Sequence, residues 1–235
     1  MSPPSDDVLI PPNLPILRVV PPVVFKALST HFYGGVKRAE ISFHYHHGDE
    51  DAVTGGLGER LIERGTVIQV GGQAFGWRTE YFKLRGRGND APEKTLGADG
   101  IFQLEVSDQQ MRVLVRKGLL FQAKIKWTQR NKKLLEQAQL LKGQSTSSIV
   151  IDYSEKEYRA IDAAEVVIAE GRRKKVRPEY DKPLAQVLGD EFIGCLRGDH
   201  GLYWDREAER LVVNHEPAPD LVPSHFIGTT LQRLE

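Results

Sequence analysis

Cysteine is almost absent from this chain of 235 residues, in which Cys195 stands alone. A single cysteine excludes an internal disulfide framework and a zinc site made of cysteines only, and it fits a reducing compartment. The sequence also lacks any run of about eighteen apolar residues, and its N-terminus lacks a charged segment followed by an apolar one. We therefore expect a cytoplasmic protein that neither spans a membrane nor is secreted.

Excess charge of either sign is also missing. The chain has 32 basic and 32 acidic residues, so its formal net charge is zero and it lacks the overall basic character of many nucleic-acid-binding proteins. Basic side chains are instead grouped locally, at Lys83, Arg85 and Arg87, at Arg112, Arg116 and Lys117, and within 124–133 and 172–177. Most groups of basic residues are only solvated surface. We expect contact with phosphate only for the groups that flank a candidate active site, because phosphate contacts supply affinity that does not depend on sequence.

The composition is that of one globular domain. Hydrophobic residues make up 40% of the chain. Prolines are frequent in residues 1–22, which predicts an extended N-terminal arm. We expect the core in residues 23–155, with residues 156–235 either completing it or forming a small recognition or assembly appendage. No internal repeat, P-loop or dinucleotide fingerprint occurs.

The stretch 97–126 has the clearest chemical pattern. Asp99, flanked by glycines, precedes a strand-like segment 101–106, and a second apolar strand follows at 119–126. Period-two alternation in the second strand places Leu119, Phe121, Ala123 and Ile125 on one face and Leu120, Gln122, Lys124 and Lys126 on the other. Polar groups between bulky apolar residues need partners, and Asp99 is the expected counter-charge.

These residue types suit metal-dependent hydrolysis of a phosphodiester. A carboxylate such as Asp99 binds a hard cation like magnesium, and Gln122 offers a neutral oxygen. Lys124 is a compact cation that orients or deprotonates a water, or stabilises charge on phosphate. A structural ion pair within a sheet is the simpler alternative.

Asp99 followed by Gln122-Ala123-Lys124 resembles the restriction-endonuclease-like PD-(D/E)xK nuclease superfamily, in the variant with Gln in place of the acidic residue, as in Mrr-type enzymes and bacterial anti-phage effector nucleases. The resemblance covers roughly residues 48 to 155. It implies an α/β fold with a mixed β-sheet flanked by helices. It also implies a Mg²⁺- or Mn²⁺-dependent DNA endonuclease with Asp99, Gln122 and Lys124 as catalytic residues. Asp99, Gln122, the Ala123 carbonyl and a carboxylate from an upstream helix would then hold the metal.

Two glutamates are candidates for the helix carboxylate. An acidic start at 49–51, followed by spaced apolar residues, predicts an amphipathic helix. Glu50 and Glu59 are nine residues apart and lie on opposite sides of such a helix, so only one serves the site. We favour Glu50 because Glu50-Asp51 with Thr54 resembles the helix start of related nucleases.

Further expectations concern partners. Arg85, Arg87, Lys126 and Arg130 are candidate DNA contacts. A double-strand cut needs two active sites, which favours a homodimer or higher homo-oligomer. The resemblance implies a role in restriction or anti-phage defence, with a sensor or activator protein as a possible partner.

Two alternatives remain open. One is an inactive scaffold with the nuclease fold, acting as a DNA-binding or assembly module. The other is a metal hydrolase using His44, His46, His47 and Asp49, residues that close spacing makes candidate zinc ligands. Because aromatic residues alternate with these histidines, we favour an ordinary strand or loop edge there.

Periodicity and turn residues predict the remaining elements. A helix over 23–33 is expected to end at Gly34-Gly35, and the turn Gly71-Gly72 is expected to join a hairpin. The other expected elements are a helix at 129–142, a strand at 148–153, a helix at 184–196 and a hairpin joining 202–204 to 211–213.

Overall fold

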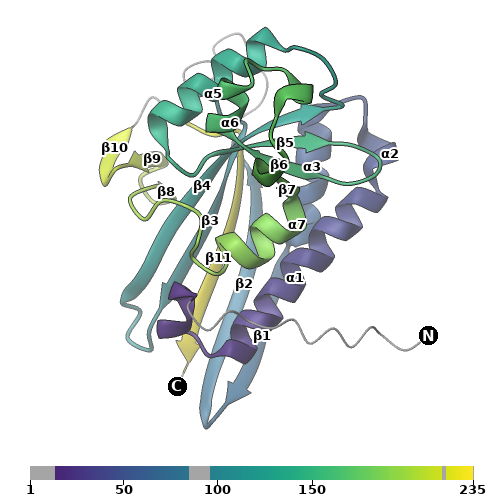
Figure 1. Ribbon diagram of the computed structural model, residues 1–235. Coiled ribbons are helices and arrows are strands. Elements are labelled where there is room, and N and C mark those ends of the chain that lie inside the picture. The colour runs from purple at the N-terminus through teal and green to yellow at the C-terminus, as the bar shows by residue number, and fades with distance from the viewer. Residues whose placement is uncertain (1–13, 85–95, 219–220, 235) are drawn as a thin grey trace, which may run out of the picture.

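A computed structural model describes residues 14–84, 96–218 and 221–234 (Figure 1). Its centre is an eight-stranded mixed sheet with the strand order β1-β2-β11-β3-β4-β5-β6-β7. The strands are β1 Glu63–Val70, β2 Gln73–Lys83, β3 Gly100–Ser107, β4 Val113–Ile125, β5 Ile149–Tyr153, β6 Arg159–Asp162, β7 Asp181–Pro183 and β11 His225–Leu234. Helices flank the sheet, so the expected α/β fold with a mixed β-sheet is confirmed.

Different helices and strands pack against the two faces of the sheet. One face packs against α1 Pro22–Ile41, α3 Glu50–Leu61, α7 Leu184–Gln186 and the π-helix η4 Val187–Phe192. The other face packs against α5 Lys132–Gln144, α6 Ala163–Ile168 and a small sheet of β8 Tyr203–Asp205, β9 Arg210–Val213 and β10 Glu216–Ala218 (Figure 1). Short 3-10 helices lie at Pro15–Arg18 (η1), Arg173–Lys175 (η2) and Pro178–Tyr180 (η3), and a four-residue helix α2 at Phe43–His46.

The alternation predicted for β4 is present. Leu119, Phe121 and Ala123 belong to the apolar cluster under α1 and α3, whereas Leu120 belongs to the cluster under α5. The strand is buried on both faces over most of its length. Such burial explains its long apolar run.

Helix α1 is longer than predicted. It continues through Gly34-Gly35 to Ile41, so the expectation that this pair ends the helix is wrong. A Cβ at Gly35 would lie 2.5 Å from Leu61 Cδ2 at the end of α3. The glycine therefore serves a close helix–helix contact, whose packing outweighs the low helix propensity of glycine.

Part of the predicted N-terminal arm over residues 1–22 is packed into the core. Leu14, Ile16 and Val20 are buried in the core around η1, and α1 begins at Pro22. Residues 1–13 lie outside the described part of the chain. The high proline content therefore led to a prediction that missed the buried apolar residues between the prolines.

The C-terminal residues supply a central strand. β11 lies between β2 and β3, antiparallel to the first and parallel to the second. The β8–β9 hairpin predicted from residues 202–204 and 211–213 is confirmed. The helix predicted over 184–196 is instead the short α7 followed by the π-helix η4.

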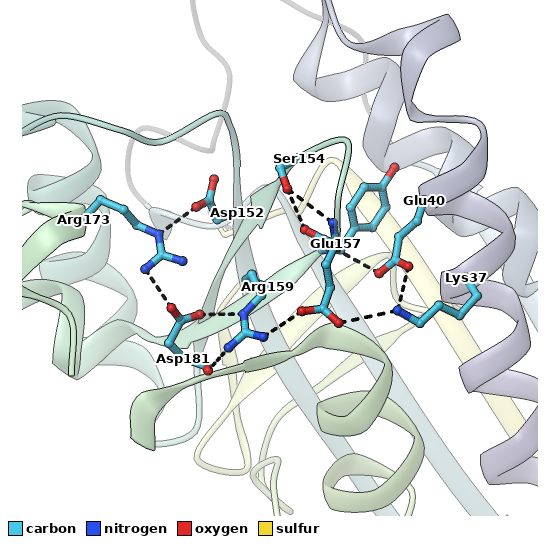
Figure 2. Close-up of polar contacts among 9 residues, drawn as sticks. Lys37, Glu40, Asp152, Ser154, Glu157, Arg159, Arg173 and Asp181 are labelled. Carbon is cyan, nitrogen blue, oxygen red and sulfur yellow. Dashed lines mark hydrogen bonds and ion pairs between the residues drawn. The ribbon is translucent and has the colours of Figure 1, made fainter. Parts of the chain in front are cut away.

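A network of alternating charges joins α1 to the β5–β7 edge of the sheet (Figure 2). Asp152 of β5 accepts a hydrogen bond from Arg173 at 2.8 Å, and the chain of ion pairs continues through Asp181, Arg159, Glu157, Lys37 and Glu40. Glu40 also accepts a hydrogen bond from the backbone N–H of Tyr158 at 3.0 Å. The network fixes the position of β5, whose Asp152 is in register with Lys124 of β4.

Among the described residues, no helix is both long and apolar enough to cross a membrane.

Candidate functional site

Four segments meet at one end of the sheet: the start of β3, the end of β4, the start of β11 and the first turn of α3. Asp99 directly precedes β3, and its main chain is held on both sides. Its N–H donates to the Phe121 carbonyl at 2.9 Å, and its carbonyl accepts from the N–H groups of Ser224 and His225, each at 2.9 Å. Asp99 is half-buried in this position.

The Asp99 carboxylate contacts β4 directly. Its Oδ2 accepts hydrogen bonds from the Ala123 N–H at 2.7 Å and from Gln122 Nε2 at 2.5 Å. Gln122 Nε2 also donates to the Ala123 carbonyl at 3.1 Å. The structure therefore brings together three of the residues predicted for the site, across the 23 residues that separate Asp99 from Gln122.

Glu50 and Lys124 form the second half of the site. Glu50 is the first residue of α3, whose N-cap Asp49 accepts from the Asp51 N–H at 3.0 Å. Glu50 Oε1 accepts a short hydrogen bond from Lys124 Nζ, and both side chains are about one third exposed, at 34% and 29%. Glu59 lies on the exposed side of the same helix, so Glu50 is the glutamate that reaches the site.

The contacts of Lys124 differ from those predicted. Asp99 was the expected counter-charge, but the ion pair of Lys124 is with Glu50, and Asp99 instead binds Gln122 and the Ala123 N–H. The alternating sequence pattern predicted which residues share a face of β4, but it could not predict where α3 packs.

Tyr153 is buried and lies close enough to Asp99 and Glu50 for their charges to affect it. Its hydroxyl is 3.2 Å from Thr54 Oγ1, and Thr54 in turn donates to the Glu50 carbonyl at 2.9 Å. Burial raises the pKa of Tyr153 far above its usual value, and the negative charges of Asp99 and Glu50 add to the effect although the Thr54 contact opposes it. The phenol therefore remains neutral and forms an uncharged floor next to two acidic groups.

Oxygen atoms in this site fit a hard cation. Gln122 is 3% exposed, and its Oε1 is buried without a hydrogen-bond partner among the described residues. A buried acceptor without a donor is unfavourable by itself, and a cation is one group that satisfies it. With the carboxylates of Asp99 and Glu50 and the Ala123 carbonyl, the donor set is all oxygen, as magnesium and manganese prefer.

Within the described ranges, no group of three or more His, Cys, Asp or Glu side chains is placed to hold a metal ion. Any cation near Asp99 therefore depends on the amide and main-chain oxygens as well. This finding covers His44, His46 and His47, which lie on or next to the short helix α2 and not on the predicted strand or loop edge.

Sequence reasoning missed a cluster beside Glu50. His225 is 2% exposed, and its Nε2 lies 2.9 Å from Asp51 Oδ1 while its Nδ1 lies 3.0 Å from the Tyr81 hydroxyl. Lys83 Nζ donates to Asp51 Oδ2 at 2.5 Å. The cluster joins α3, β2 and β11, and so holds the start of α3 against the sheet. Its members come from three distant segments, so no local pattern could have found it.

Burial and ion pairing act in opposite directions on the pKa values in this cluster. Burial lowers the pKa of His225, and the neighbouring Asp51 carboxylate opposes that shift only in part. Burial by itself would raise the pKa of Asp51, but Lys83 and His225 outweigh it and leave this pKa lowered. Asp51 is thus the charged anchor of the cluster.

The predicted DNA contacts are only partly located. Arg85 and Arg87 lie outside the described residues. Lys126 and Arg130 are exposed on the segment that follows β4, where Lys126 forms an ion pair with Glu155 at 3.3 Å. Both therefore lie near the end of β4 that contains Lys124.

Comparison of the chain with protein-family models, with curated proteins and with solved structures finds no match. Function must therefore be inferred from the site itself: two carboxylates, a buried amide oxygen and an ion-paired lysine at the end of a mixed sheet.

Proposed function

We propose that this chain is a metal-dependent endonuclease that hydrolyses phosphodiester bonds of DNA. The observation that supports this most strongly is the convergence of Glu50, Asp99, Gln122 and Lys124 from three separate elements, with the Oε1 of Gln122 buried and without a donor in the part of the chain that the structure describes. A structural ion pair would need only Glu50 and Lys124. It would not account for an amide oxygen that lies beside a carboxylate and has no hydrogen-bond partner among the described residues.

Each residue has a distinct part in this reaction. Asp99, Glu50, Gln122 Oε1 and the Ala123 carbonyl would hold Mg²⁺ or Mn²⁺, which supplies Lewis acidity and lowers the pKa of water. Lys124 orients the attacking water or stabilises the charge that develops on the phosphate. Water attacks phosphorus, one P–O ester bond breaks, and the departing oxygen takes up a proton.

The neutral Gln122 weakens the site for metal relative to a carboxylate, because an amide oxygen carries no net charge. Its 2.5 Å hydrogen bond to Asp99 offsets this by holding that carboxylate in one orientation. We propose that these residues would hold one ion, and that a second ion would bind only together with the DNA phosphate.

The biological setting is proposed from the resemblance in the sequence. A nuclease of this kind serves in restriction or in bacterial anti-phage defence. Cutting both DNA strands would require a homodimer or higher oligomer, and a sensor or activator protein would limit the activity to infected cells.

The test is cleavage of supercoiled plasmid in magnesium, in manganese and in EDTA. Metal-dependent nicking is expected from the wild type, with a loss of at least about 100-fold in Lys124→Ala and Asp99→Ala. Lys142→Ala, an exposed lysine at the end of α5, is the matched control and should cut like the wild type. Cutting that survives both site substitutions would show that these residues are not the active site.

The second candidate is a DNA-binding or assembly scaffold that has lost catalysis. The ion pair between Lys124 and Glu50 favours it, because a lysine neutralised by a carboxylate is less available to phosphate. Metal-independent DNA binding by the wild type, without cleavage in either metal, would support this candidate.

A further inference from the structure

A cavity of about 290 Å³ lies between the end of β2, the start of β11 and the β8–β9 hairpin. It is lined by Phe82, Leu84, Trp204, Arg206, Glu209, Val222 and Phe226. Three of the seven side chains are aromatic and two are charged with opposite signs. The volume is just below the usual range for ligand pockets, about 300–1,000 Å³, which suits one small planar group.

The aromatic walls differ in exposure. Trp204 and Phe226 are buried, at 5% and 2% exposed, whereas Phe82 is 37% exposed. The rings of Phe82 and Phe226 have centroids 6.2 Å apart and are tilted by 35°. The cavity therefore has a fixed apolar floor and an accessible aromatic edge.

Charged groups lie at the cavity as well. The Arg206 guanidinium is 4.6 Å from the centroid of the Phe82 ring and forms an ion pair with Glu80 at 2.6 Å. Glu209 adds a carboxylate from the β8–β9 hairpin. A ligand with a flat apolar face, donor groups at its edge and a nearby negative charge matches this set.

The cavity lies on the same face of the sheet as Gln122 and Lys124 of the candidate active site, whereas Glu50 belongs to α3 on the opposite face. Phe226, Ile101 and Leu120 are in register across β11, β3 and β4, and Phe226 and Leu120 belong to the same apolar cluster. Gln122 and Lys124 follow Leu120 on the same side of β4 by alternation. Two strand spacings of about 4.8 Å, combined with about 3.3 Å per residue along β4, place Gln122 and Lys124 roughly 12 and 16 Å from Phe226.

We propose that this cavity binds an unpaired nucleobase of the DNA, within about three nucleotides of the cleaved phosphate. The proposal rests on the nuclease function above. Stacking on the accessible Phe82 ring, above the buried Phe226, binds the face of any base, the Glu209 carboxylate accepts from an exocyclic amino group, and Arg206 contacts the adjoining phosphate. The substrate class is therefore DNA with a bulged, flipped or single-stranded base near the cut.

The test is binding of a short duplex that carries one unpaired 2-aminopurine, compared with the same duplex fully paired. Lys124→Ala protein is used so that binding is measured without cleavage, and binding is followed by 2-aminopurine fluorescence and by titration. We expect the bulged duplex to bind about 5- to 150-fold more tightly, the range that stacking of one base supplies.

Phe82→Ala and Arg206→Ala, each added to Lys124→Ala, should remove most of this preference. Arg78→Ala is the matched control, because Arg78 lies 4.0 Å from the same Glu80 but does not line the cavity. Equal affinity of the two duplexes, or an equal loss in Arg78→Ala, would overturn the proposal.

Cleavage is then measured with protein in which Lys124 is intact and Phe82→Ala or Arg206→Ala is present. This experiment separates the base-pocket hypothesis from the nuclease hypothesis. Cleavage without any preference for the bulge would refute the base pocket and leave the nuclease function in place. A preference for the bulge without cleavage in magnesium or manganese would refute the nuclease function and support the pocket as a binding site.

Discussion

Replacement of Gln122 by Glu tests the proposed metal site with the least change in shape. Gln122 is 3% exposed, and its Nε2 donates to Asp99 Oδ2 at 2.5 Å. Gln122→Glu removes that donor and places a second carboxylate next to the first. We expect the metal-free protein to lose stability and the metal-bound protein to regain it.

The magnitude follows from the separation. Two unit charges about 4 Å apart repel by about 4 kcal/mol at an effective dielectric constant of about 20, and protonation of one carboxylate limits the loss. The lost hydrogen bond to a charged group adds about 1.5–3 kcal/mol. A net loss of about 2–4 kcal/mol in EDTA corresponds to a fall in Tm of about 4–16 °C for a domain of this size.

Magnesium should reverse the loss. A cation at 100 times its Kd stabilises the folded state by about 2.7 kcal/mol, and a third carboxylate strengthens its binding. Thermal unfolding of wild type and Gln122→Glu, in EDTA and across a magnesium titration, measures both effects. The magnesium-induced rise in Tm should be larger in the variant than in the wild type.

Gln103→Glu is the matched control. Gln103 is also a buried glutamine of the sheet, at 8% exposed, and its Oε1 accepts from the Trp204 N–H at 2.7 Å, a role that a carboxylate retains. It should show no response to magnesium beyond that of the wild type. Reasoning about the metal site is refuted if Gln122→Glu responds to magnesium no more than Gln103→Glu does.

Three further predictions concern stability. Burial lowers the pKa of His225 below its ordinary 6.5, so the unfolded chain binds more protons than the folded one. The stability from neutral His225 is present above pH 6.5 and is lost as the pH falls toward the folded pKa; urea unfolding at pH 8 and pH 5.5 should show a larger loss in wild type than in His225→Asn. Burial lowers the pKa of Lys117 from 10.5 to about 8, so the free energy of unfolding should rise by about 3 kcal/mol as the pH is raised from about 8 to about 10.5. A Lys117→Met variant whose free energy of unfolding rises equally over this pH range would contradict this. Gly35→Ala should destabilise the protein by about 1–3 kcal/mol, because the added Cβ would lie 2.5 Å from Leu61 Cδ2. Gly143→Ala in α5 should stabilise it by about 0.5–1 kcal/mol, because an added Cβ there has no atom within 4 Å. An equal effect of the two substitutions would refute the packing role of Gly35.

Local sequence patterns correctly predicted the turns, helix caps and strand faces that depend on neighbouring residues. The turn Gly71-Gly72 has positive φ at both residues and joins β1 to β2 as expected. Asp49 caps α3, and Asn131 caps α5 by accepting from the Leu134 N–H at 2.9 Å, which starts that helix three residues later than the predicted 129. Alternation along β4 gave its two faces correctly.

Long-range packing accounts for what the sequence did not predict. Insertion of β11 between β2 and β3 joins segments more than a hundred residues apart, and no local pattern specifies such a pairing. The partner of Lys124 and the contacts of His225 both depend on where α3 lies on the sheet. The residues Asp99, Gln122 and Lys124 were identifiable from spacing, but their mutual geometry was not.

Substitution of Asp99 by Asn gives the most direct test of the central claim. An Asn at this position keeps an oxygen to accept from the Ala123 N–H, so the fold should survive while the negative charge is lost. Plasmid cleavage in magnesium should fall by at least about 100-fold, with Tm within a few degrees of the wild type in EDTA. Wild-type cleavage rates in a folded Asp99→Asn protein would contradict the assignment of this site as the catalytic centre.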